Sequence, residues 1–280
     1  KDAKDCIADI LKVDSKEIYF TSGGTESNNM AFIGTAIANR RAGKHVITTR
    51  IEHASVHEPM AYLEEMGYDV TYLPVDSTGR VSVEELENAI REDTFLISIM
   101  YVNNEVGSVQ PIEQIGQMLK KKHPQILFHV DAIQAFGKYK IVPKKLGVDM
   151  MSVSGHKIHG PKGSGFLYVN EKVKIRPILF GGGQQDGMRS GTENVPAIAG
   201  LGVAVKEIYT GHSEKRAKLY ELKKRLIAGL QDVDGVTINA LIDPIEETAP
   251  HIVSVSFANT RSEVMLHALA QKGVFVSLRY

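Results

Sequence analysis

The chain has 280 residues, and a hydrophobic content of 43% gives it enough apolar surface for a substantial core. Lys plus Arg and Asp plus Glu both number 33, so the zero net charge favours neither nucleic acid nor an anionic membrane as partner. No apolar run reaches the length of a transmembrane helix. The single cysteine, Cys6, excludes an intrachain disulfide framework, and no signal peptide is recognisable, which together indicate a cytoplasmic protein. A small neutral or zwitterionic substrate is favoured.

Short apolar strands and helical patterns alternate along most of the chain. The predicted strands cover 17–21, 45–49, 70–73, 96–101, 127–130, 148–153 and 165–169. The predicted helices cover 4–11, 29–38, 57–65, 83–91, 112–122 and 195–209. This alternation predicts an α/β fold with a mostly parallel central sheet flanked by helices.

The character of the sequence changes beyond Gly211. A charged helix over 213–230 precedes two predicted strands, 236–239 and 252–257, and a helix over 263–271. We therefore predict a large domain at 1–210 and a smaller C-terminal α+β domain at 211–280.

A glycine-containing loop joins the first predicted strand to the next helix. Gly23 and Gly24 leave backbone amides uncovered there, and Thr25 and Ser27 add hydroxyl donors. Because these groups lie at the positive end of the helix dipole, we interpret the loop as a phosphate cradle. The sequence is neither a Walker A loop nor G-x-G-x-x-G, so a nucleotide is not favoured. A helix capping box with a flexible entry is the alternative.

Polar residues follow three of the predicted strands. His53 follows the strand at 45–49, at the edge of the sheet where such folds open a crevice, and it could cover a flat ring there. His53 and His57 could share a helical face, but no carboxylate or thiol set nearby supports a metal site. Asn104 ends another apolar run. Asp131 directly follows a buried strand, where a carboxylate needs a cation or full hydrogen bonding, unless it is a helix N-cap.

One lysine, Lys157, lies between a small polar run and a glycine-rich turn in the stretch 152–169. An amine that forms a Schiff base must lie close to a carbonyl and be partly desolvated. A solvated surface lysine is the alternative for this residue taken alone. A second glycine-rich loop, 181–192, contains Arg189 and Thr192, which could reach an anion.

A carboxylate, a reactive lysine, a phosphate cradle and a ring-covering imidazole are together typical of a pyridoxal phosphate site. The motifs that carry this combination are TSGGTESN at 21–28, VNNEVG at 102–107, HVD at 129–131, SGHK at 154–157 with GPKG at 160–163, and GMRSGT at 187–192. They resemble those of the cysteine desulfurases in the class V aminotransferase family. The resemblance covers nearly the whole chain and implies the fold type I of pyridoxal-phosphate-dependent transferases.

The resemblance also implies a role for each matching residue. Lys157 would carry the cofactor as a Schiff base and move protons as general base and acid. The cofactor phosphate would be held by Gly24, Thr25, Ser154 and His156. Thr192 would reach the phosphate bound by the other subunit of a homodimer.

The remaining implied roles concern the ring and the substrate. His53 would stack on the ring, Asp131 would pair with the ring nitrogen, and Gln134 would contact the ring oxygen. Asn104 would orient both cofactor and substrate. The family converts L-cysteine to L-alanine and leaves the sulfur as a persulfide on a mobile cysteine, from which a sulfur-acceptor or scaffold protein takes it for pathways such as iron–sulfur cluster assembly.

The end of the chain departs from the family pattern. The stretch 273–277 is similar to the strand before the family's cysteine loop, but Leu278-Arg279-Tyr280 resembles a later segment whose arginine grips the substrate carboxylate. We therefore hypothesise that a stretch with the nucleophilic cysteine is missing after Ser277, as are both ends of the family sequence. Cys6 lies in an apolar helical stripe and is interpreted as structural. A selenocysteine lyase, another class V enzyme, or a catalytically inactive scaffold for sulfur-transfer partners are the alternatives.

Overall fold

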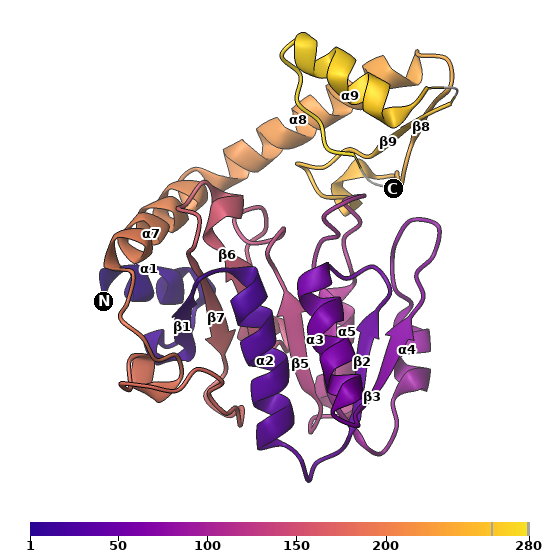
Figure 1. Ribbon diagram of the computed structural model, residues 1–280. Helices are drawn as coiled ribbons and strands as arrows, with labels where there is room; N and C mark the ends of the chain where they lie inside the picture. Colours follow the sequence, from indigo (N-terminus) through magenta and orange to yellow (C-terminus); the bar gives the residue numbers. More distant parts are fainter. Residues whose placement is uncertain (259, 279–280) are drawn as a thin grey trace.

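The computed structural model describes residues 1–258 and 260–278. A seven-stranded sheet, in the order β1-β7-β6-β5-β4-β2-β3, forms the centre of the larger body (Figure 1). The strands are β1 (Ile18–Thr21), β2 (His45–Thr49), β3 (Asp69–Leu73), β4 (Thr94–Met100), β5 (Leu127–Asp131), β6 (Met150–Ser154) and β7 (Gly165–Val169). Neighbours from β6 to β3 are parallel, whereas β7 is antiparallel to both β1 and β6. The predicted mostly parallel sheet is thus confirmed.

Helices cover both faces of this sheet. They are α1 (Asp2–Leu11), α2 (Gly24–Ala38), α3 (Ala54–Glu65), α4 (Val83–Ala89), α5 (Ile112–Lys122), α6 (Pro143–Leu146) and α7 (Val195–Tyr209). Buried side chains of α2 and α3, such as Phe32 and Met60, belong to one hydrophobic cluster. Those of α1, α5 and α7, such as Ile7, Ile115 and Leu201, belong to a second. The sheet therefore lies between two apolar layers.

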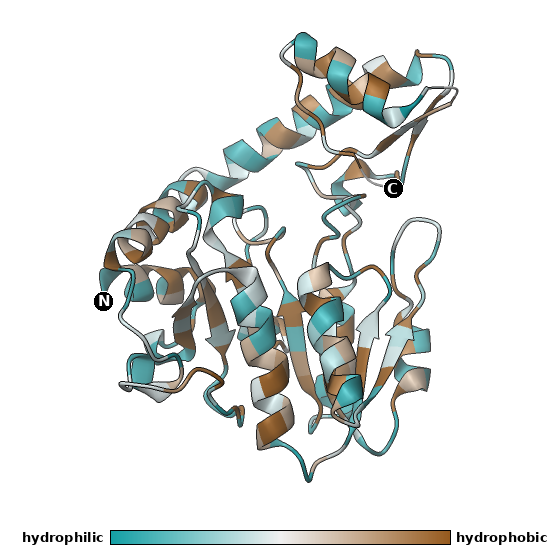
Figure 2. Ribbon diagram, in the orientation of Figure 1, coloured by the Kyte–Doolittle hydropathy of each residue, from teal (hydrophilic) through white to brown (hydrophobic). Residues whose placement is uncertain are grey.

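The central strands are apolar on both faces, and Figure 2 shows their hydrophobic colouring. All seven residues of β4 are buried. Successive side chains of a strand point to opposite faces, so Leu96 joins the α2–α3 cluster while Ile97 and Ile99 join the other. Burying such a side chain contributes about 1.5–3 kcal/mol, which explains why these strands form a continuous apolar run.

A second, smaller unit follows the long helix α8 (His212–Gln231), which runs from the larger body toward the C-terminal elements (Figure 1). The unit contains β8 (Val236–Ile238) and β9 (Val255–Phe257), which pair antiparallel, and α9 (Ser262–Gln271). Among the described residues no helix combines the length and the apolar character needed to cross a bilayer.

Candidate active site

Most of the predicted site residues lie at one edge of the sheet. β2, β4, β5 and β6 are parallel neighbours, so their carboxyl ends meet there. Asp131 is the last residue of β5 and Ser154 the last of β6. His53 and Asn104 follow β2 and β4, and Gly24 begins α2.

Asp131 is buried at the centre of this edge. Its Oδ1 atom accepts a hydrogen bond from the backbone amide of Ile133 at 3.0 Å, and its Oδ2 atom accepts one from Asn28 Nδ2 at 2.9 Å. Burial raises the pKa of the Asp131 carboxyl, and the bond from Asn28 opposes that rise. Asp131 makes no ion pair within the described part of the chain. The carboxylate is therefore hydrogen-bonded and caps no helix, and it can still receive a cationic group.

A chain of hydrogen bonds connects Asp131 to His53. The Asn28 amide nitrogen that binds Asp131 also donates to Ser55 Oγ at 3.0 Å. Ser55 Oγ lies 2.9 Å from His53 Nδ1, and the Ser55 backbone amide donates to the same nitrogen at 3.0 Å. His53 Nδ1 is thus an acceptor, and a neutral imidazole carries its proton on Nε2. His53 is exposed and forms the N-cap of α3.

Asn28 and Ser55 were not among the predicted site residues. Their role depends on contacts between α2, α3 and β5, which lie far apart in the sequence. A signal was present in the motif at 21–28, which ends on Asn28. An amide inside an apolar helix needs a buried partner, and Asn28 is fully buried.

The predicted phosphate cradle begins α2. A Cβ added to Gly24 would lie 2.0 Å from Ile133 Cδ1, so a larger residue there would require the Ile133 side chain to move. Ser154 Oγ hydrogen-bonds His156 Nδ1 at 2.8 Å on the neighbouring loop. Burial lowers the pKa of His156, with Lys157 and Lys162 adding to the effect. The helix N-terminus and these hydroxyl and imidazole groups are the kinds of donor that bind an anion.

Arg189, which was expected to bind an anion, forms an ion pair with a residue of this chain instead. Its Nε atom lies 2.7 Å from Glu26 Oε1, in the first turn of α2. Glu26 Oε2 in turn accepts a bond from the backbone amide of Ser22. The ion pair therefore fastens the loop at 181–192 to the start of α2. Thr192 is exposed in the same loop and makes no hydrogen bond to the cradle within the described residues.

Lys157 lies on a short 3-10 helix, Gly155–Ile158, directly after β6. Its side chain is exposed in this single chain, so the expected partial desolvation is not provided by the residues described here. The buried amine of Lys138 lies 3.5 Å from the Lys157 carbonyl oxygen. Lys157 also helps to lower the pKa of His251, which burial brings to about 3. The lysine is therefore close to Lys138 and His251, on the side facing the C-terminal unit.

Two further predicted residues border the site. His251 Nε2 donates to Gln134 Oε1 at 3.3 Å, which leaves the amide nitrogen of Gln134 free to face another group. Asn103 holds the turn after β4, because its Oδ1 accepts from the amides of Glu105 and Val106, both at 2.9 Å. Asn104 is half-exposed on the same turn. Arg279, predicted to bind the substrate carboxylate, lies outside the described residues.

The described residues contain no group of three or more His, Cys, Asp and Glu side chains able to hold a metal ion. His57, which could have paired with His53, stacks instead on Tyr72 at 5.8 Å between ring centroids.

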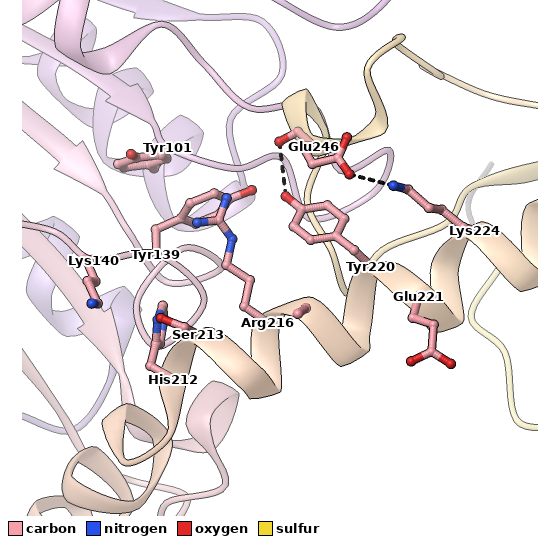
Figure 3. A pocket seen from close by; sticks show the side chains of 11 residues that line it. Tyr101, Tyr139, Lys140, His212, Ser213, Arg216, Tyr220, Glu221, Lys224 and Glu246 are labelled. Atoms are coloured by element: carbon pink, nitrogen blue, oxygen red, sulfur yellow. Dashed lines mark hydrogen bonds and ion pairs between the residues drawn. The ribbon is translucent and has the colours of Figure 1, made fainter.

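A cavity of about 830 Å³ lies at the start of α8 and contains none of the predicted site residues (Figure 3). Arg216 lies over the rings of Tyr139 and Tyr220, at 4.9 and 5.5 Å from their centroids. Lys224 and Glu246 form an ion pair at its rim. The cavity belongs to the joint between the two units.

The comparisons with known proteins agree with this geometry. The family described as aminotransferase class V matches residues 1–278. The protein named cysteine desulfurase IscS from Methanosarcina thermophila is 49% identical over 270 residues, which are 96% of this chain and 66% of that protein. Its namesake from Clostridium botulinum is 42% identical over 276 residues, 98% of this chain and 69% of that protein. The chain thus spans about two thirds of their length.

Solved structures give the same result. A NifS-like protein superposes with a TM-score of 0.94 at 44% identity, covering 99% of this chain and 75% of the other. A structure titled "SspA in complex with cysteine" has a TM-score of 0.79 at 36% identity, covering 99% and 76%. The resemblance that the motifs predicted is confirmed, and the chain belongs to the class V aminotransferase family, among relatives named cysteine desulfurases.

Proposed function

We propose that this chain is the main part of a pyridoxal-phosphate-dependent cysteine desulfurase, which converts L-cysteine to L-alanine and passes the sulfur on as a persulfide. The surroundings of Asp131 are the main support for this proposal. Asp131 is a buried carboxylate with two neutral hydrogen-bond donors and no ion pair within the described residues, and a hydrogen-bond chain joins it to His53. Asp131 could therefore hold the positive charge of a protonated pyridine nitrogen.

The residues present fit the cofactor. Gly23 and Gly24 have no side chains at the start of α2, so the backbone amides there can approach a phosphate closely. Gly24 and Thr25 would hold the phosphate there, with Ser154 and His156 completing the anion site.

The ring would lie between the anion site and Lys157. His53 would cover one face, and Asp131 would pair with the ring nitrogen. The amide nitrogen of Gln134 would donate to the ring oxygen, because His251 already occupies its amide oxygen.

The bound cofactor supplies an electron sink for charge that develops on the substrate. Asp131 keeps a proton on the ring nitrogen, and the Asn28 and Ile133 donors hold the Asp131 carboxylate in place. Lys157 would bind the cofactor carbonyl and move a proton at the substrate α-carbon. Asn104 would orient the substrate, and Arg279 would bind its carboxylate.

Sulfur transfer needs a thiol acceptor in addition. Burial raises the pKa of the Cys6 thiol, with Asp9 adding to the rise, so Cys6 is a poor nucleophile and keeps its structural role. Cys6 is the single cysteine of these 280 residues, so the acceptor would be a cysteine beyond them or one of a sulfur-acceptor or scaffold protein. Thr192 would complete the site of the partner subunit in a homodimer. We further propose that the protein is cytoplasmic and that its domains cover 1–210 and 211–280.

The similar structure described as "SspA in complex with cysteine" supports cysteine as the substrate. The test uses the purified full-length protein with L-cysteine and a thiol reductant, and it measures alanine and sulfide. We expect both products in equal amounts, and an absorption band in the visible that borohydride removes. Product from selenocysteine alone would favour the selenocysteine lyase instead. A colourless protein without turnover would favour an inactive scaffold.

A further inference from the structure

Glu52 is a buried carboxyl group that takes no part in the proposed reaction. Its Oε1 atom accepts hydrogen bonds from Thr49 Oγ1 at 2.9 Å and from the backbone amide of Met100 at 2.8 Å. Its Oε2 atom is buried and has no hydrogen-bond partner among the described residues. No Lys, Arg or His of the described chain forms an ion pair with it.

Glu52 lies beside the candidate site. It follows β2 and directly precedes His53, the N-cap of α3. Its partner Met100 on β4 is opposite Asp131 in the register of β4 and β5. Two buried carboxyl groups therefore share the same edge of the sheet.

The two carboxyl groups have unequal surroundings. Asp131 accepts hydrogen bonds from the Asn28 side chain and the Ile133 backbone amide. The nearby His53 also favours the charged form of Asp131. Glu52 has a hydroxyl donor on β2 and an amide donor on β4, neither of which titrates, and the charged group that acts on it is Asp131 on β5. Two buried negative charges so close together are costly, so the group with fewer favourable partners takes up the proton. Burial and Asp131 together raise the pKa of Glu52 to about 8.

We propose that Glu52 is a positioning residue that stays protonated at neutral pH, so that Asp131 carries the single negative charge beneath the cofactor ring. This inference rests on the proposed function for the identity of the ring. Through Thr49 and Met100, the side-chain Oε1 atom of Glu52 joins the ends of β2 and β4 without adding charge. Above about pH 8, Glu52 ionises and places a second negative charge next to Asp131.

Glu52→Gln is the sharpest variant, because glutamine reproduces the neutral shape of a protonated glutamate. Glu58→Gln, at an exposed position on α3, is the matched control. The first readout is the infrared carbonyl stretch of a protonated carboxylic acid, followed against pH in the holoenzyme and the cofactor-free protein. We expect the parent and E58Q to lose such a band around pH 8, and E52Q to lack that loss.

The second readout is thermal unfolding of the cofactor-free protein. A folded-state pKa of about 8, raised from 4.5, contributes stability that is complete below the lower value and is lost as the pH rises to the upper one. The melting temperature of the parent and E58Q should therefore fall more steeply across that window than that of E52Q. At pH 7, E52Q should bind the cofactor within about twofold of the parent.

Unchanged infrared and melting profiles in E52Q would overturn the proposal. A tenfold weaker cofactor affinity of E52Q at pH 7 would also overturn it, because that loss would mean that cofactor binding requires an ionised carboxylate at position 52. Failure of the parent to bind pyridoxal phosphate at any pH would contradict the proposed function instead. The protonation of Glu52, seen in the cofactor-free protein, would then still stand.

Discussion

The edge of the large sheet and the C-terminal unit are built differently. At the sheet edge, all residues of β2, β4 and β6 are buried, and Asn28, Asp131 and Ser55 are joined by buried hydrogen bonds. In the C-terminal unit, β8, β9 and α9 contain no fully buried residue within the described part of the chain. The groups of the candidate site are therefore held in a buried scaffold, whereas the C-terminal elements are less buried.

The attachment uses few contacts, and they converge on the stretch 245–252. Lys223 of α8 donates to Thr248 Oγ1 at 2.6 Å and to the Ala249 carbonyl at 2.7 Å. Ala249 in turn donates its amide to the carbonyl of Gly107, on the loop that carries Asn104. This stretch thus places the C-terminal unit against the site, and its Ala249 and Ile252 pack into the main hydrophobic core.

The largest effect is expected at Lys157. Lys157→Ala removes the amine that binds the cofactor and moves the proton, so alanine formation should fall about 10³-fold or more. The measurement is the rate of alanine release from L-cysteine. Lys162→Ala, in the same loop and exposed, is the control and should keep nearly the parent rate. Equal losses in both variants would remove the lysine from the chemistry.

Asn28→Ala tests whether the hydrogen-bond chain organises the site. It removes the donor to both Asp131 and Ser55, and a buried bond to a charged group is worth about 1.5–3 kcal/mol. Cofactor affinity should fall roughly tenfold or more by the same estimate, as measured by equilibrium titration. Asn39→Ala, at the other end of α2, serves as the control. Parent-like affinity in N28A would show that Asp131 needs no such support.

Tyr220→Phe tests the attachment of the C-terminal unit. The hydroxyl group donates to the carbonyls of Glu246 and Thr248, at 3.1 and 3.0 Å. Its loss should lower stability by about 1 kcal/mol and leave cofactor affinity at the parent value. Chemical denaturation and cofactor titration measure the two effects. A drop in affinity comparable to that of N28A would mean that the two regions are not separable.

The smallest effect is expected at an exposed ion pair between the same two regions. Arg80 and Glu247 lie 2.7 Å apart, with 30% and 47% of their side chains exposed. Glu247→Gln should change stability by no more than about 0.5 kcal/mol, because solvent screens such pairs. Denaturation at low and high salt measures it, and a loss as large as that of Tyr220→Phe would contradict the expectation.

The large domain was more predictable from the sequence than the contacts at its site. The helices at 112–122 and 195–209 were predicted with the observed bounds, because their apolar periodicity is strong. The predicted helix at 29–38 in fact begins at Gly24, since a Gly-Gly pair suggests a loop but here permits close approach of Ile133. The strand predicted at 252–257 is shorter, Val255–Phe257.

Lys157 and Asp131 could be proposed as reactive residues because the relevant chemistry is visible in single motifs. The supporting residues could not be proposed in this way. Asn28, Ser55 and Glu52 acquire their roles from partners on other strands and helices, which no local pattern reveals. Arg189 was expected to meet an anion, and its pairing with Glu26 likewise depends on tertiary contacts.

The most direct measurement reduces the holoenzyme with borohydride, digests it, and locates the pyridoxyl group by mass spectrometry. We expect the pyridoxyl group on Lys157. We also expect Asp131→Asn to shift the visible absorption band of the unreduced protein. A pyridoxyl group on a different lysine, or a visible band indifferent to Asp131→Asn, would contradict the assignment of this sheet edge as the active site.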